Sequence, residues 1–256
     1  MVPQTPSLLL RLIPSARLLS LLGFLAAWEV AGRLAASRML PTFSHVVAVL
    51  WRETLSGALP ANLGITLWRI AAAFTLSMVL GSALGLAMGR LPKLDRVLDA
   101  WLTGLLNLPA LVLTVLIYVW FGLSEASAIL AVTLNKLPTT AVTLREGARA
   151  LDPGLLEMAH IYRMPPGRVL RHVVLPQLAP YLFAAARSGL ALIWKIVLVV
   201  ELLGRSDGVG FQIEVYFQLF DVTGILAYTL AFALVVQALE WGVLQPLERR
   251  ALGWRA

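Results

Sequence analysis

The chain has 256 residues, of which 59% are hydrophobic and only 14% charged, and its mean hydropathy is +0.81. Soluble domains average about 45–50% apolar and about 25% charged residues, so this composition indicates a membrane protein. In a soluble protein the net charge of +7 would suggest a nucleic-acid partner, but basic residues also collect in the cytoplasmic loops of membrane proteins, and we favour that explanation. The absence of cysteine excludes disulfides and thiol catalysis.

Six apolar stretches follow one another along the chain, and each is close to the roughly 20 residues that a helix needs to cross the hydrocarbon core. No small-residue cleavage site follows the first stretch, so it is predicted to be an uncleaved span and not a signal peptide. The sequence therefore predicts an all-α membrane protein with about six transmembrane helices, at residues 18–36, 63–88, 97–120, 126–144, 181–203 and 222–244.

Lys and Arg residues are distributed unevenly between the two sides of these stretches. Most of the 21 lie in segments that would be cytoplasmic if the N-terminus were inside the cell. Because cytoplasmic loops are enriched in these residues, both ends of the chain are predicted to be cytoplasmic. The resulting organisation has a cytoplasmic N-terminal segment at 1–17, a transmembrane domain at 18–246 and a cytoplasmic tail at 247–256.

Small and helix-breaking residues mark three of the stretches. Gly81, Gly85 and Gly89 recur every four residues, which strips one helix face of side chains and lets another backbone approach. We expect this face to pack within one bundle, with a subunit contact as the alternative. The third stretch contains Asn107-Leu108-Pro109 and the fourth contains residues 135–140, with Pro138. Both breaks are expected to face a bundle interior or a path, where freed carbonyls find partners.

The segment between the fourth and fifth stretches, at about residues 145–176, is too polar to cross the membrane. Asp152 is a good N-cap for a helix whose first position is Pro153, and Pro165-Pro166 ends that helix. A second short helix is predicted to follow, after which Leu175-Pro176 turns the chain back into the membrane. Periodicity alone leaves open whether the first helix packs on the membrane, on its own bundle or on another protein. Its apolar face is formed by Leu155, Met158, Ala159 and Tyr162.

This segment resembles the "EAA" loop in the permease subunits of ABC importers. Glu157-Met158-Ala159 corresponds to the Glu-Ala-Ala of that loop, and Val173-Val174-Leu175-Pro176 to its Ile-x-Leu-Pro. The sequence departs from the family pattern at Arg163, which occupies the position of a glycine, and Gly167 lies too far along to replace it. This departure bears on the turn between the two short helices.

Four further motifs extend the resemblance over nearly the whole chain. They are closest to the branch of importers for nitrate, sulfonates, taurine, bicarbonate and thiamine-pyrimidine precursors. Residues 119–123, Val-Trp-Phe-Gly-Leu, resemble the Leu-Trp-Phe-Gly-Leu element of that branch, and residues 40–44 resemble its Leu-Pro-x-Pro entry. Residues 145–153 resemble its Gly-Val-Arg-Ala-Val-Asp-Pro, and residues 201–204 resemble the Ala-Glu-Met-Leu end of its fifth span.

The resemblance implies a type I ABC importer permease in a bacterial inner membrane, which performs no chemistry and binds no cofactor. Its partners would be ABC ATPase subunits that bind ATP and Mg, a second permease subunit in a homodimer, a periplasmic or lipid-anchored substrate-binding protein, and membrane lipids. Independently, none of the three lysines lies in a Gly-Lys-Ser/Thr sequence, so the chain has no P-loop and ATP must be hydrolysed elsewhere. The implied ATPase-coupling residues are Leu155, Glu157, Met158, Ala159, His160, Arg163, Gly167, Leu175 and Pro176.

Polar groups inside spans are functional candidates, because placing them in lipid is costly. A cationic path would suit a small anion such as nitrate, a sulfonate or a related organic acid. The alternatives for Lys195 are snorkelling to the interface or pairing with Glu201, while Arg69 and Arg187 are expected near span ends. The candidate substrate-path residues are Asn107, Asn135, Lys136, Lys195 and Glu201.

No catalytic or metal site is predicted, because the three histidines lack metal-ligand spacing and no Ser-His-Asp arrangement is recognisable. An ion-coupled secondary transporter is one alternative function, but it would have inverted repeats with helix breaks in matching halves. Pro109 and Pro138 instead lie in adjacent stretches. A membrane scaffold or channel subunit is the other alternative, and it would not need the loop at 145–176.

Overall fold

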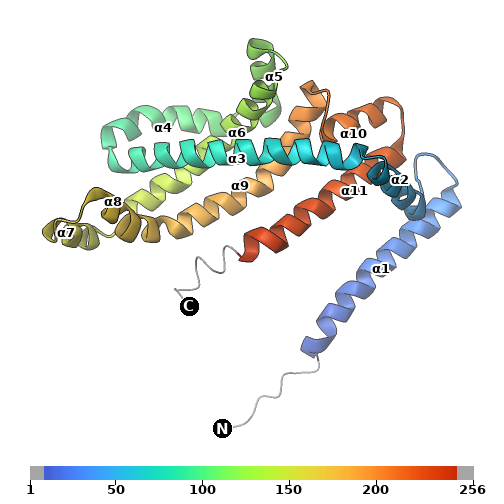
Figure 1. The fold of residues 1–256 in the computed structure, drawn as a ribbon, viewed down its shortest axis with the longest axis horizontal. Coiled ribbons are helices and arrows are strands. Elements are labelled where there is room, and N and C mark those ends of the chain that lie inside the picture. Colours follow the sequence, from blue (N-terminus) through green and yellow to red (C-terminus); the bar gives the residue numbers. More distant parts are fainter. Residues whose placement is uncertain (1–8, 247–256) are drawn as a thin grey trace, which may run out of the picture. The chain divides into compact units, whose positions relative to one another are not determined.

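The computed structural model describes residues 9–246, in which every regular element is a helix (Figure 1). The described chain forms two compact units: one combines residues 9–59 with Ile213–Ala231, and the other combines Pro60–Gln212 with residues 232–246. The predicted cytoplasmic tail at 247–256 lies outside the described residues, as do residues 1–8 of the predicted N-terminal segment. The helices are α1 (Leu9–Ala35), α2 (Phe43–Leu55), α3 (Ala58–Arg90), α4 (Pro92–Asn107), α5 (Ala110–Phe121), α6 (Glu125–Arg149), α7 (Pro153–Ile161), α8 (Pro166–Val169), α9 (Leu175–Gly204), α10 (Val209–Gln218) and α11 (Val222–Leu239), with π-helical turns η1 (Leu170–Val174) and η2 (Glu240–Leu244).

Four of the predicted spans coincide with helices that are long and apolar enough to cross a membrane. These helices comprise Leu18–Ala35, Ala58–Arg90, Pro166–Gly204 and Val222–Gly242. The fourth predicted span is α6. At 25 residues it is about 37 Å long, but it is more polar than these four helices. Its polarity fits its position, because much of α6 is buried among other helices of the chain and does not need to match lipid.

The third predicted span is not one continuous helix. It consists of α4 and α5, which are bent by 102° relative to each other. At 16 and 12 residues, neither helix alone reaches across about 30 Å of hydrocarbon. The bend has a local cause: Pro109 has no amide hydrogen and pushes Leu108 into an extended conformation, with φ −73° and ψ 128°. By contrast, the predicted break at Pro138 is wrong, because α6 continues through it.

The glycine face of α3 lies against α6. A Cβ atom added at Gly81 would stand 2.7 Å from Cβ of Thr140, and one added at Gly85 would overlap the carbonyl oxygen of Ala141. Gly89 is equally crowded by α6. Because no side chain separates them, the two helices meet at their backbones. This confirms the expected packing within one bundle. The helix α9 also packs against α6 (Figure 1).

The fifth predicted span begins earlier than expected, because α8, η1 and α9 form one helical rod from Pro166 to Gly204. The predicted turn at Leu175-Pro176 is therefore wrong. Proline normally disturbs an α-helix, since its ring crowds the carbonyl of the residue four positions earlier. Here the amide of Leu175 bonds the carbonyl of Leu170, which widens the helix directly before Pro176. The π turn thus accommodates the proline without a change of direction.

The unit that contains α1 and α2 is held together by a small apolar core and a few polar contacts. The buried residues of this apolar core are Val46, Val49 and Ala227. The indole of Trp28 donates a hydrogen bond to the carbonyl of Pro41, at 2.9 Å, which fixes the link between α1 and α2. Thr42 caps α2 by accepting a hydrogen bond from a backbone amide of its first turn.

Candidate functional site: an exposed helix and a buried ionic cluster

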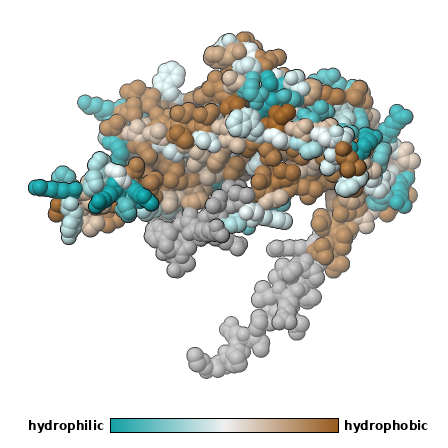
Figure 2. Space-filling view, in the orientation of Figure 1, coloured by the Kyte–Doolittle hydropathy of each residue, from teal (hydrophilic) through white to brown (hydrophobic). Residues whose placement is uncertain are grey.

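At one end of the larger unit, α7 and α8 project beyond the ends of α6 and α9, and side chains there are largely hydrophilic where the spans are hydrophobic (Figures 1 and 2). The helix α7 begins as the sequence predicted, because the carboxylate of Asp152 accepts a hydrogen bond from the amide of Gly154 at 2.8 Å. The amide of Asp152 donates to the side chain of Gln177 in α9, also at 2.8 Å. A hydrogen bond therefore connects the start of α7 to the first turn of α9.

The outer face of α7 is apolar. Leu155 is 40% and Met158 43% exposed, and Ile161 and Tyr162 are each 75% exposed. Ala159, which we expected on this face, is only 1% exposed and packs inward. The apolar periodicity assigned the wrong side to Ala159 and omitted Ile161, because a helix of only nine residues has too few apolar positions to determine its rotation.

The polar coupling candidates surround this apolar face. Glu157, His160 and Arg163 are exposed on or just after α7, and Gly167 is exposed in α8. Leu175 is exposed at the start of α9, whereas Pro176 is half-buried. Between α7 and the α8–η1 turn lies a groove of about 410 Å³, lined by Leu156, Ala159, His160, Met164, Pro166, Val169, Leu170 and Val174.

The turn after α7 places Arg163 in a conformation that favours glycine. Its φ is +47°, and its amide donates to the carbonyl of His160 at 2.9 Å. The next amide, of Met164, reaches back to the carbonyl of Ala159 at 2.9 Å. These two bonds define a Schellman motif, in which the left-handed residue is most often glycine. The turn therefore keeps its shape although arginine occupies the position of the family's glycine.

Replacing Arg163 with glycine is expected to stabilise the chain by about 1 kcal/mol, because glycine removes the steric cost of the left-handed conformation. Arg163→Ala keeps that cost and should give no gain, so it serves as the matched control. Thermal unfolding of the detergent-solubilised protein measures both. Equal stabilisation by alanine and glycine would show that loss of the arginine side chain, and not the backbone, is responsible.

Ion pairs connect the C-terminal end of α6, which leads into α7, to α4. The guanidinium of Arg145 bonds the carboxylates of Asp95, at 3.2 Å, and Asp99. Arg149, one turn later, also pairs with Asp95. These pairs are partly exposed, so each contributes little to stability by itself. They nevertheless link the two helices that lead into the α7 segment.

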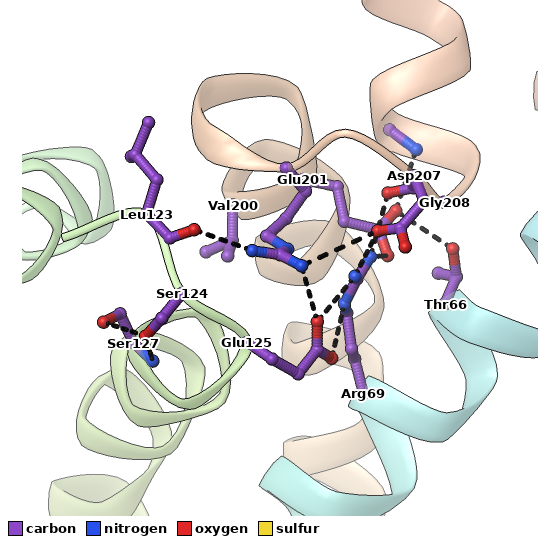
Figure 3. Close-up of polar contacts among 12 residues, drawn as sticks. Thr66, Arg69, Leu123, Ser124, Glu125, Ser127, Val200, Glu201, Asp207 and Gly208 are labelled. Atoms are coloured by element: carbon purple, nitrogen blue, oxygen red, sulfur yellow. Dashed lines mark hydrogen bonds and ion pairs between the residues drawn. The ribbon is translucent and has the colours of Figure 1, made fainter.

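At the opposite ends of α6 and α9, a buried ionic cluster joins three helices around Arg69 of α3 (Figure 3). The side chain of Arg69 is 2% exposed and forms two parallel bonds with Glu125 of α6, at 2.8 and 2.7 Å. It also bonds Glu201 of α9 at 2.8 Å, and both the carboxylate and the carbonyl of Asp207. Sequence reasoning missed this role, because the partners of Arg69 are distant in the chain.

Glu201 is completely buried and has all its interactions within this cluster. Its second oxygen accepts hydrogen bonds from the hydroxyl of Thr66 and the amide of Gly210, both at 2.9 Å. The expected alternative pairing with Lys195 is wrong. Arg205 completes the cluster by pairing with Glu125 at 3.0 Å. The cluster contains three carboxylates and two guanidiniums. It pairs the buried charges of Arg69 and Glu201 with each other and holds α3, α6 and α9 together.

The other candidate path residues are dispersed. Asn107 is exposed at the end of α4 and Asn135 is half-buried in α6, and each amide donates to a carbonyl of its own helix, at 2.8 and 2.9 Å. Lys195 is exposed on α9. Lys136 is completely buried in α6, and its ammonium group has no hydrogen-bond partner among the residues that the structure describes.

Comparison with known proteins gives one consistent family. Residues 77–241 match the family described as binding-protein-dependent transport system inner membrane components. SsuC of Bacillus subtilis, whose name assigns it to aliphatic sulfonates transport, is 32% identical over 90% of this chain and 84% of its own length. The taurine transport system permease protein TauC of Escherichia coli is 28% identical over 75% of this chain and 70% of its own.

The fold agrees with this family. An inward-facing structure of the MetNI methionine ABC transporter superposes with a TM-score of 0.66 at 20% identity, covering 78% of this chain and 98% of the other. Several helices of the chain are long and apolar enough to span a membrane. The chain therefore belongs to the binding-protein-dependent transport system inner membrane components, as a permease of an ABC importer in the sulfonate, taurine, nitrate and bicarbonate branch.

Proposed function

We propose that the chain forms the transmembrane pathway for a small anion, with a sulfonate as the first candidate, and that α7 transmits force from a separate ATPase. The substrate class is supported by the relatives, whose names refer to sulfonates and taurine. The docking role rests on one observation above all: α7 presents Leu155, Met158 and Ile161 to solvent at the hydrophilic end of the larger unit. An exposed apolar face with a polar rim is typical of a protein interface.

The proposed assembly has two copies of this chain, two ATPase chains and a binding protein on the outer side. ATP and Mg would be bound by the ATPases, because this chain has no P-loop. The α7 end would be cytoplasmic, in agreement with the clustering of Arg163, Arg168 and Arg171 there. Both chain termini would then also be cytoplasmic. Because the chain belongs to this family, we favour an importer permease over the two alternatives, a secondary transporter and a scaffold or channel subunit.

In the proposed mechanism the apolar face of α7 fills a groove of the ATPase, while Glu157, His160 and Arg163 contact its rim. Closure of the ATPases would move α7, and the motion would pass to α9 in two ways. One is the bond between Asp152 and Gln177, and the other is the continuous rod through η1. The Arg69 cluster would keep the far ends of α3, α6 and α9 moving as one body.

Reversing the charge of Glu157 tests the docking role. Glu157→Arg is expected to abolish co-purification with the ATPase, or stimulation of ATP hydrolysis by the loaded binding protein, because an exposed carboxylate at the interface becomes a repelled cation. Since Glu157 is exposed, the permease itself should still fold and insert. Glu214→Arg, the same reversal on α10, is the control and should remain coupled. Normal coupled transport by Glu157→Arg would contradict the proposal.

A further inference from the structure

A polar pocket of about 520 Å³ lies at the C-terminal end of α1, within the unit that contains α1 and α2. It is formed by the link from α1 to α2 and by the turn from α10 to α11. Gly32 lets the link run close to α1, because an added Cβ there would stand only 2.9 Å from Cα of Thr42. The polar and charged side chains in the wall of the pocket are Ser37, Arg38, Thr42, His45, Asp221 and Thr223.

The pocket contains a cation and an anion that are available to a ligand. Arg38 is exposed and forms no ion pair with any residue that the structure describes. Asp221 is half-buried, and its carboxylate accepts a hydrogen bond from the amide of Gly224, at 3.1 Å, in the first turn of α11. Within the described part of the chain Asp221 likewise has no ion-pair partner. A pocket with one unpaired charge of each sign is complementary to a zwitterion.

An apolar groove of about 500 Å³ adjoins the polar pocket, and Leu40 lines both. Its residues in α1 are spaced three and four apart and therefore share one helix face, on which Ala27 and Ala31 leave space. Trp28 is held in place by the hydrogen bond from its indole to the carbonyl of Pro41, at 2.9 Å. The full set of lining residues is Phe24, Ala27, Trp28, Ala31, Leu40 and Leu226.

The groove and the pocket lie at different depths of the membrane. The apolar stretch Leu18–Ala35 of α1 is long enough to span, only 6% of it is buried inside the chain, and its described side chains are mainly hydrophobic (Figure 2). Because this stretch ends directly before Ser37 and Arg38, the pocket is at the level of lipid headgroups. The groove, which follows the last turns of the stretch, is at the level of acyl chains.

We propose that the polar pocket and the apolar groove together bind one zwitterionic phospholipid of the phosphatidylethanolamine type. Arg38 bonds the phosphate, Asp221 bonds the ammonium group, and an acyl chain lies in the groove over Trp28. A polar site that continues into an apolar one matches the two halves of an amphiphile. A small anion such as a sulfonate would be repelled by Asp221 and would leave the groove empty. The inference does not depend on the docking role of α7 or on the transported substrate.

Native mass spectrometry of the purified chain tests the proposal. The protein is delipidated in detergent and titrated with phosphatidylethanolamine, and we expect one tightly bound lipid per chain. Phosphatidylglycerol, which lacks the ammonium group, should bind severalfold more weakly. Glycerophosphoethanolamine, the same headgroup without acyl chains, should bind at least about tenfold more weakly, because it buries no apolar surface in the groove.

Three variants assign the binding to particular side chains. Arg38→Gln should weaken it about tenfold, because a charge-assisted bond to the phosphate is lost. Ala31→Phe should weaken it to a similar extent, since the ring fills the groove that the acyl chain needs. Asp221→Asn should remove the preference for phosphatidylethanolamine over phosphatidylglycerol, and it keeps an oxygen that can accept the bond from Gly224.

Matched controls use the same substitutions outside the site. Arg52→Gln removes an exposed cation of α2 that does not line the pocket, and Ala26→Phe adds the same ring on the nearly opposite face of α1. Both should bind the lipid as the natural chain does. Arg38 and Ala31 are also exposed, so their variants are expected to fold, and thermal unfolding without lipid checks this.

Several results would overturn the inference. One is a natural chain that retains no lipid, and another is unchanged binding by both Arg38→Gln and Ala31→Phe. Methanesulfonate that binds as tightly as the lipid would identify a small-anion site instead. Lipid that is bound by the monomer but lost from the dimer would show that a second copy covers the groove. None of these measurements involves the ATPase, so their outcome is separate from that of Glu157→Arg.

Discussion

Replacing Arg69 with methionine is expected to destabilise the permease by about 3–5 kcal/mol, because the fully buried carboxylate of Glu201 would lose its compensating charge. The same substitution removes the paired bonds to Glu125 and the contacts to Asp207. Thermal unfolding of the detergent-solubilised protein, together with its yield in membranes, measures the effect. A variant as stable as the natural protein would show that the cluster contributes no net stability.

Two further variants separate the buried charge from the rest of the cluster. In Arg69→Met with Glu201→Gln, the buried position carries no net charge, so part of the lost stability should return. Glu125 and Asp207 would lose Arg69 as a partner, but each is 40% exposed and has Arg205 nearby. Arg205→Met is the matched control. Its main ion-pair partner, Glu125, is 40% exposed, and among the described residues its side chain forms no ion pair with the carboxylate of Glu201, so a smaller loss is expected.

Gly85→Leu is expected to have the second large effect, with a loss of about 3 kcal/mol or more. An added Cβ there would overlap the carbonyl oxygen of Ala141 and stand 2.9 Å from the amide nitrogen of Arg145. Both obstacles are backbone atoms of α6, which no rotamer change can move. The two helices must therefore separate, and the contacts on both sides of Gly85 are lost with them.

Gly64→Leu in the same helix is the matched control, because an added Cβ at Gly64 meets no atom within 4 Å. It should unfold close to the temperature of the natural protein, while Gly85→Ala should lie between the two leucine variants. Thermal unfolding in detergent and the amount of folded protein in membranes provide the measurements. Equal stability of Gly64→Leu and Gly85→Leu would contradict the backbone contact between α3 and α6.

Local features of the chain were predictable because their causes are local. The cap formed by Asp152, the start of α7 at Pro153 and the apolar helices at 18–35 and 222–242 all follow from residues within a few positions of one another. The bend at Pro109 was anticipated as an interruption, but not as two separate helices at 102°. A proline determines where a helix ends, whereas the direction of the next helix depends on what it packs against.

The sequence by itself therefore determined the class of the protein, the positions of most spans and the location of the segment that we propose to dock with an ATPase. Tertiary structure alone decided which side of α7 faces outward, which left Ala159 buried and Ile161 exposed. It also decided the partners of Glu201 and the packing of Lys136 against Gly189. These outcomes depend on contacts between residues far apart in the chain, and periodicity or spacing within one helix carries no information about them.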